Sequence, residues 1–142
     1  MASMFSKIIM GEIPSYKIAE DENNYAFLDI NPLANGHTLV VPKKEVDYLF
    51  NLDEDSYDEL FKFTRKVSKA IERVISCKRL GVVIYGLDVP HAHVHLIPLQ
   101  GAGNEINFHC YKNRKDKQAN ITVYAAVVDG NLVVDFSIAD GQ

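Results

Sequence analysis

Three histidines, His91, His93 and His95, alternate with apolar residues in the second half of the chain. Successive side chains of a β-strand point to opposite faces, so in an extended segment all three imidazoles lie on the same face. The residues between them suit the buried face of such a strand. Pro90 and Pro98 bracket the run and disfavour a helix. The pattern predicts a strand with a row of imidazoles on one side and a core-packing row on the other.

Imidazole offers two kinds of chemistry to such a row. A neutral ring ligates metals, and titration near neutral pH lets the ring act as nucleophile, acid or base. Three alternating residues span about 13 Å at ~3.3 Å per residue, so one small ion is hard to share among all three. Chance clustering on an exposed strand is the weakest alternative, because the chain has only five histidines. We therefore rank catalysis above metal binding, and metal binding above accident.

A fourth histidine, His37, follows Gly36 and begins an apolar strand over residues 37–42. Glycine suits a tight turn or a close approach to a ligand. A histidine at the start of a strand is, taken alone, more often structural than catalytic. His109 has no comparable context and is assigned no role.

The clearest helix follows this strand, with Asn51 or Asp53 as its N-cap and acidic residues in its first turn. Apolar residues recur at steps of three and four from Tyr57 to Ile75, which is one helical stripe. The basic residues lie mostly off this stripe and predict a solvated face: Lys62, Arg65, Lys66, Lys69 and Arg73.

The remaining elements complete an α+β order. A short helical turn is expected over 5–10, a β-hairpin over 16–20 and 25–28, a buried strand over 79–85, a polar loop over 100–120 and a second hairpin over 121–128 and 132–138. The basic run at 112–117 within that loop is expected to be solvated. No repeat or linker divides residues 1–142, so we expect one domain.

The composition restricts the function classes. A net charge of −4 and a pI near 5.7 argue against a general nucleic-acid binder, which needs a basic face. The two isolated cysteines, Cys77 and Cys110, indicate a reducing compartment. No apolar stretch approaches the ~18 residues of a membrane span. We therefore expect a cytoplasmic protein that contacts neither nucleic acid nor membrane.

The histidine run, His-Ala-His-Val-His-Leu-Ile at 91–97, resembles the signature of the histidine triad (HIT) family of nucleotide-binding hydrolases and transferases. Segments 5–14, 26–32 and 36–43 also resemble family landmarks in the right order. The likeness covers about residues 4–100, whereas 101–142 is divergent. It implies a HIT-like α+β domain: an antiparallel sheet of about five to seven strands, one long helix and a short N-terminal helix.

The resemblance also implies a mechanism. The middle histidine, His93, would attack the α-phosphorus of a nucleotide and form a nucleotidyl-imidazole intermediate, which water or another acceptor cleaves. His95 would neutralise charge on the phosphate oxygens, and His91 would orient the row. His37 would line the same pocket from the neighbouring strand.

The resemblance further implies a nucleotide-binding set. Asp29 matches the family's ribose-binding acid, although aspartate in Asp-Ile-Asn-Pro is also a common turn-former. Ile30 and Phe27 would lie near the base, with core packing as the alternative for Phe27. Before the triad the chain reads Gly-Leu-Asp-Val-Pro, where many members have polar phosphate-binding residues. Leu87 cannot bind phosphate, and Asp88 would repel it, be protonated, point away or orient a histidine.

Two further departures concern the ribose and zinc. Ile84 or its neighbour stands where an asparagine often helps to hold the ribose. Some bacterial members bind a structural zinc, and the corresponding positions here, Ser3, Ser6 and Glu45, are wrong for zinc. We therefore expect no metal and no cofactor.

These patterns predict an enzyme that hydrolyses a purine nucleotide conjugate, such as an AMP phosphoramidate, through His93. An acyl or sulfate ester of AMP belongs to the same class, and a dinucleoside polyphosphate is the next choice. The resemblance implies a homodimer with joined sheets. The alternative is a nucleotide-binding module with little or no catalysis, and a third hypothesis is a metal enzyme that uses the histidine row.

Overall fold

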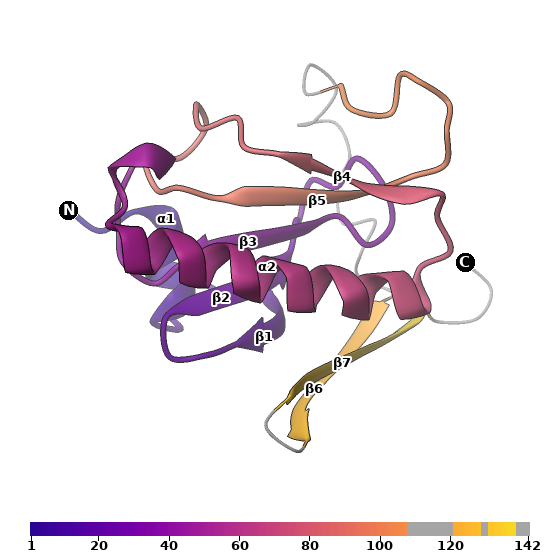
Figure 1. The fold of residues 1–142 in the computed structure, drawn as a ribbon, viewed down its shortest axis with the longest axis horizontal. Helices are drawn as coiled ribbons and strands as arrows, with labels where there is room; N and C mark the ends of the chain where they lie inside the picture. The colour runs from indigo at the N-terminus through magenta and orange to yellow at the C-terminus, as the bar shows by residue number, and fades with distance from the viewer. Residues whose placement is uncertain (108–120, 129–130, 139–142) are drawn as a thin grey trace.

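The computed structural model describes residues 1–107, and for residues 121–128 and 131–138 the backbone. Along the chain the elements are α1 (Met4–Ile9), β1 (Tyr16–Glu20), β2 (Asn24–Leu28), β3 (Thr38–Pro42), the 3₁₀ turn η1 (Leu49–Asn51), α2 (Glu54–Val74), β4 (Arg79–Val83), β5 (Val94–Leu99), β6 (Ile121–Val128) and β7 (Asn131–Ile138). The first five strands form one antiparallel sheet in the order β1-β2-β3-β5-β4 (Figure 1). Strands β6 and β7 form a separate two-stranded sheet. The predicted fold class, an α+β domain with a long and a short helix, is confirmed.

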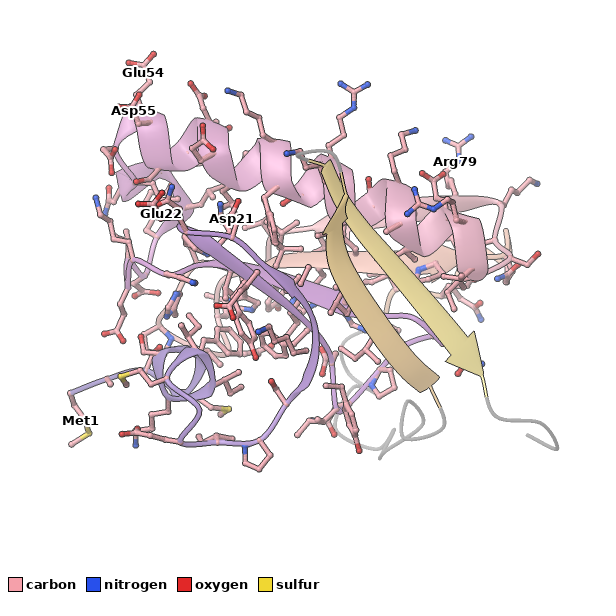
Figure 2. The ribbon with its side chains drawn as sticks, turned by 90° about the horizontal axis from the view of Figure 1, so that it is seen from below. Met1, Asp21, Glu22, Glu54, Asp55 and Arg79 are labelled. Atoms are coloured by element: carbon pink, nitrogen blue, oxygen red, sulfur yellow. The ribbon has the colours of Figure 1, made fainter. Side chains whose placement is uncertain are left out.

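The two helices cover opposite faces of the five-stranded sheet (Figure 2). Val40 and Val94 point toward α2 and belong to the larger core, whereas Leu39 points toward α1 and belongs to the smaller one. His95 is paired with Leu39 in the register of β3 and β5, so both side chains lie on the α1 face. The alternation of the strands therefore separates the main core from the histidines.

Helix α2 forms as its sequence predicts. The side chain of Asp53 accepts a hydrogen bond from Ser56 N–H at 3.2 Å and caps the helix, while Asn51 belongs to the preceding 3₁₀ turn. Glu54 and Asp55 in the first turn and Arg73 in the last turn complement the helix dipole. Its buried residues lie at helical spacing: Leu60, Phe63, Thr64, Val67, Ala70 and Ile71.

Both predicted hairpins are confirmed. The first joins β1 to β2, and its turn is closed by Asp21 Oδ1, which accepts from the N–H groups of Asn23 and Asn24. The second joins β6 to β7; of its predicted turn at 129–131, residues 129–130 lie outside the described residues and Asn131 begins β7. The basic run at 112–117 and His109 also lie outside them.

The histidine strand differs from its prediction. Strand β5 begins at Val94 and continues through Pro98, so His91 and His93 precede it, with His91 in a bend and neither residue in strand pairing. Strand pairing stops there because polar groups of this segment form other hydrogen bonds. Ala92 N–H donates to Val46 O at 2.7 Å, and the ring of His91 donates to the Pro42 carbonyl. Of the three histidines, only His95 therefore lies in a strand.

Strand β4 is also shorter and more exposed than predicted. It ends at Val83, and among the described residues it pairs with β5 alone, so its other side is an edge of the described sheet. Val82 is 57% exposed on this strand, and Tyr85 and Leu87 are exposed just beyond it. An apolar run predicts a buried strand, but the sequence carries no signal that distinguishes an edge from the centre of a sheet.

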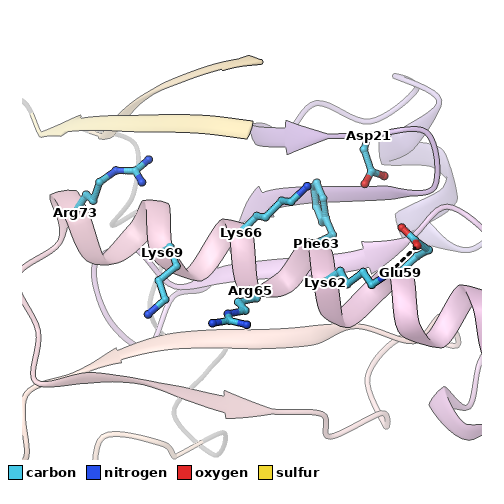
Figure 3. Close-up of a pocket in the computed structure, with 8 residues that line it drawn as sticks. All are labelled: Asp21, Glu59, Lys62, Phe63, Arg65, Lys66, Lys69 and Arg73. Carbon is cyan, nitrogen blue, oxygen red and sulfur yellow. Dashed lines mark ion pairs between the residues drawn. The ribbon is translucent and has the colours of Figure 1, made fainter. Parts of the chain in front are cut away.

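The basic side chains of α2 lie on its outer face, as predicted, beside a surface hollow of about 420 Å³ (Figure 3). Lys62 and Lys69 form exposed pairs with Glu59 and Glu72 at 3.6 and 3.8 Å, and such pairs contribute little to stability. The hollow lies against α2, on the other side of the sheet from α1. Within the described ranges, no helix is both long and apolar enough to cross a membrane.

Candidate active site

A cavity of about 710 Å³ opens on the α1 face of the sheet. Of the residues predicted to form the site, five line it: Phe27, Asp29, Ile30, Asp88 and His93. The other three, His37, His91 and His95, are not among its lining residues but contact them from behind. The volume falls within the usual range for small-molecule sites. The fold thus assembles residues from β2, the loop after it and the segment before β5 around one hollow.

His93 is the triad member that reaches the cavity. Its Nδ1 lies 2.8 Å from the backbone carbonyl of His91, which can only accept, so the proton of the neutral ring sits on Nδ1. Nε2 therefore carries a lone pair. Burial lowers the pKa of His93 below its usual 6.5, against the opposing effects of the His91 carbonyl and Asp88. A neutral ring with a free lone pair is the state required of a nucleophile.

His95 and His37 form a directed hydrogen-bond chain. Leu33 N–H donates to Nδ1 of His37 at 3.0 Å, so a neutral His37 carries its proton on Nε2. That proton is donated to Nδ1 of His95 at 3.0 Å, which leaves the proton of neutral His95 on Nε2. Burial lowers the pKa of His37 well below 6.5 and that of His95 to about 3. This chain of hydrogen bonds from Leu33 through His37 makes His95 a hydrogen-bond donor at Nε2.

Asp29 lines the cavity at the end of β2 and is 3% exposed. One carboxylate oxygen accepts from Asn31 N–H at 2.9 Å, and the other lies 3.6 Å from Nε2 of His37. Burial raises the pKa of Asp29 to about 6; the Asn31 bond opposes this, and the charge of Asp88 adds to it. Asp29 therefore both forms the turn after β2, through its bond to Asn31 N–H, and lines the cavity.

Asp29, His37 and His95 are also the described residues that could hold a metal ion, since one donor atom from each lies within 4.8 Å of the others. Zinc binds such nitrogen and oxygen donors at about 2.0–2.2 Å. An ion bound by Nε2 of His37 and Nδ1 of His95 must displace the proton that these two atoms share. Metal binding and the hydrogen-bond chain therefore exclude each other, and the expected absence of a metal stays a prediction.

The segment before the triad forms the outer rim of the cavity. Leu87 is 77% exposed, and Asp88 is exposed and lines the hollow. Asp88 is close enough to act electrostatically on both Asp29 and His93. The role of Asp88 among its four alternatives stays a prediction.

Helix α1 supplies a wall of the cavity that sequence reasoning did not predict. Met4, Phe5 and Ile8 line the cavity, and the Phe5 ring lies edge-on to His93 with 5.0 Å between ring centroids. The spacing of Phe5 and Ile8 marks one face of a helix, but it does not say what that face covers. Ile13, Pro14 and Leu39 complete the apolar part of the wall.

Fold and cavity together define an α+β domain with a buried histidine cluster behind a pocket. A family model described as the HIT domain matches residues 10–102. A HIT-like protein of Borreliella burgdorferi is 44% identical over 102 residues, which cover 67% of this chain and 73% of that protein. An adenosine 5′-monophosphoramidase of Schizosaccharomyces pombe is 37% identical over 69% of this chain and 74% of its own.

A crystal structure of a HIT family member from Bacillus subtilis matches with a TM-score of 0.70 at 34% identity, over 75% of this chain and 79% of that one. The chain therefore belongs to the HIT family. The resemblance drawn from the four sequence segments is confirmed at the level of the family.

Proposed function

We propose that this protein hydrolyses the α-phosphate bond of a purine nucleotide conjugate, an AMP phosphoramidate in the first instance, with His93 as nucleophile. The observation that carries the proposal is the state of His93. Its Nδ1 proton is held by the His91 carbonyl, so its Nε2 lone pair is available in a cavity that also contains Asp29. Relatives named adenosine 5′-monophosphoramidase support the substrate class.

In the first step, the amine nitrogen of the substrate takes a proton from water, Nε2 of His93 attacks the α-phosphorus, a bond between phosphorus and Nε2 forms, and the P–N bond breaks so that the amine leaves neutral. The ring gains positive charge, which the carbonyl of His91 stabilises through the Nδ1 proton. His95 donates from Nε2 to the phosphoryl group or the departing amine, because its Nδ1 is occupied by His37.

In the second step, water attacks phosphorus and loses a proton to solvent, which balances the proton taken up in the first step, and the bond to Nε2 of His93 breaks, releasing AMP. The net reaction consumes one water and yields AMP and the free amine. Asp29 accepts hydrogen bonds from the ribose hydroxyls, since it is ionised above its pKa of about 6. Ile30 and Phe27 contact the base from the apolar part of the lining.

The test is intact-mass detection of a nucleotidyl adduct after rapid acid-free quenching with an AMP phosphoramidate. We expect the adduct on wild type and not on His93→Ala, with AMP binding retained by the variant. His93→Gly with added imidazole is the matched rescue, because a free imidazole can occupy the vacated position. Turnover by His93→Ala at the wild-type rate contradicts the proposal.

A second candidate is a nucleotide-binding module with little or no catalysis. It is favoured by Asp88, whose carboxylate lines the cavity that would receive the phosphate, and by the apolar Leu87 beside it. Tight AMP binding without turnover in the wild type supports this candidate. If Asp88→Asn gains turnover and the exposed control Asp55→Asn does not, the lack of turnover in the wild type is caused by repulsion between the Asp88 carboxylate and the phosphate.

We further infer a homodimer joined through β4, in a cytoplasmic protein. The support is the open edge of β4 together with the exposed apolar side chains of Val82, Tyr85 and Leu87. An open edge of this kind pairs readily with a second strand, and apolar side chains beside it gain from burial.

A further inference from the structure

Ser3, Ser6, Glu45 and His91 form one hydrogen-bonded cluster, named here the N-terminal clasp. Glu45 Oε1 accepts from Ser3 N–H and from the Ser6 hydroxyl, both at 2.6 Å. The Ser3 hydroxyl oxygen accepts from Ser6 N–H at 3.0 Å and so caps α1. The clasp joins the start of α1 to the chain beyond β3 and to the segment before β5.

The direction of the bond between Ser3 and His91 follows from its neighbours. Nε2 of His91 lies 2.7 Å from the Pro42 carbonyl, which can only accept, so the neutral ring carries its proton on Nε2. Nδ1 must then accept, and the Ser3 hydroxyl lies 2.7 Å from it. Two other acceptors lie near this hydroxyl: Ser6 Oγ, farther away at 3.4 Å, and the Glu45 carboxylate, whose pKa the hydroxyl helps to lower and which already accepts from Ser3 N–H and from the Ser6 hydroxyl. Ser3 therefore donates to His91.

The clasp acts on the position of the His91 carbonyl. Both ring nitrogens of His91 are held, and its own N–H donates to Val89 O at 2.8 Å. The carbonyl of this residue accepts the Nδ1 proton of His93 at 2.8 Å. Because the hydrogen bonds to Ser3 and Pro42 anchor the ring on both sides, they also restrain the backbone of His91, and with it the carbonyl that sets the tautomer of His93.

We propose that Ser3 is a positioning residue for His93: its hydroxyl, through His91, holds His93 with the Nε2 lone pair directed at the substrate. The inference rests on the proposed function for its kinetic part. Ser3 does not line the cavity and is 7% exposed, so water does not readily replace its hydroxyl. The same hydroxyl caps the helix that places Phe5 against His93.

The experiment compares Ser3→Ala, Ser3→Thr and Ser6→Ala in the full chain. Ser3→Thr keeps a hydroxyl, whereas Ser6→Ala removes a bond to the same Glu45 oxygen without touching His91. We expect Ser3→Ala to lower kcat about tenfold, as a small misplacement of a reacting group does, with KM and AMP affinity within about twofold of wild type. Ser3→Thr should recover most of kcat, and Ser6→Ala should match wild type.

The second readout is the imidazole tautomers of His91 and His93, from nitrogen-15 NMR of the protein without substrate. We expect Ser3→Ala to lose the single Nε2–H tautomer of His91 and to broaden or shift His93. If Ser3→Ala does not fold, Ser3→Gly replaces it, because glycine caps a helix nearly as well as serine. This readout needs no turnover, so it remains decisive if wild type proves inactive and the proposed function fails.

Two results overturn the inference. One is a Ser3→Ala protein whose His91 and His93 tautomers are those of wild type. The other is a Ser6→Ala protein that loses as much kcat as Ser3→Ala, since the clasp would then only hold α1 in place.

Discussion

Nε2 of His37 lies 3.0 Å from Nδ1 of His95, and both side chains are buried. Because Leu33 N–H already occupies the other nitrogen of His37, the shared proton belongs to His37, and His95 keeps its own proton on Nε2. A histidine that is not among the residues lining the cavity thus decides which nitrogen of His95 can donate.

Replacement of His37 tests this relationship. We expect His37→Leu to lower kcat at least about tenfold, because His95 loses the donor that fixes its proton on Nε2. His37→Gln retains an N–H donor, so its kcat should fall less than that of His37→Leu. The leucine variant also leaves Leu33 N–H without its acceptor, at a cost of about 1–3 kcal/mol of stability. Steady-state kinetics and urea unfolding measure both effects, and equal kcat in His37→Leu and wild type would argue against a role for this bond.

The stability of the fold should depend on pH in a direction set by the buried histidines. Burial lowers the pKa of all four, so below pH 6.5 the unfolded chain binds protons that the folded chain does not. The free energy of unfolding therefore falls as the pH decreases from 6.5 toward 3, by ~1.4 kcal/mol per pH unit for each such proton. Urea unfolding near neutral pH and at about pH 5 checks the sign.

Asp29 should oppose this dependence. Its pKa is 3.8 in an unperturbed carboxyl and about 6 in the fold, so between these values the folded chain binds the extra proton. Its contribution to stability is present below pH 3.8 and is lost as the pH rises through 6. Asp29→Asn should therefore steepen the loss of stability on acidification, and an unchanged pH slope contradicts the assignment.

Asp29 also makes a prediction about nucleotide recognition. If its carboxylate accepts hydrogen bonds from the ribose hydroxyls, wild type should bind AMP about tenfold more tightly than 2′-deoxy-AMP, one charge-assisted hydrogen bond being worth roughly 1.4 kcal/mol or more. Asp29→Asn should weaken AMP binding and reduce this discrimination. Calorimetric titration with AMP and with 2′-deoxy-AMP measures both affinities. Asp55→Asn is an exposed control with the same change of charge.

The edge of β4 makes a prediction about assembly. If the proposed homodimer forms through β4, a lysine at Val82 places a charge on the exposed side of that strand, so Val82→Lys should dimerise more weakly than wild type. Met10→Lys, at another exposed apolar residue, should leave assembly unchanged. Sedimentation velocity distinguishes the two, and a Val82→Lys protein that dimerises as strongly as wild type would place the interface elsewhere.

The sequence by itself determined the elements and the chemistry available to them. Periodicity predicted helix α2, because the spacing of apolar residues reports which side of an element is buried, and turn chemistry at 21–24 predicted the hairpin of β1 and β2. Alternation put the triad imidazoles on one side of an extended segment, and the ordered motifs identified the family. Each of these patterns and motifs is local, because it is contained in a short stretch of neighbouring residues.

Only the tertiary structure decided how the histidines differ from one another. His93 reaches the cavity while His91 and His95 lie behind it, because each ring takes a partner from a distant part of the chain: Ser3 for His91, and His37 for His95. The edge position of β4 and the place of Phe5 in the wall of the cavity were likewise decided only by the tertiary structure. Hydrogen bonds between residues 58 or 88 positions apart leave no periodic trace in a sequence, since they depend on which surfaces the fold brings together.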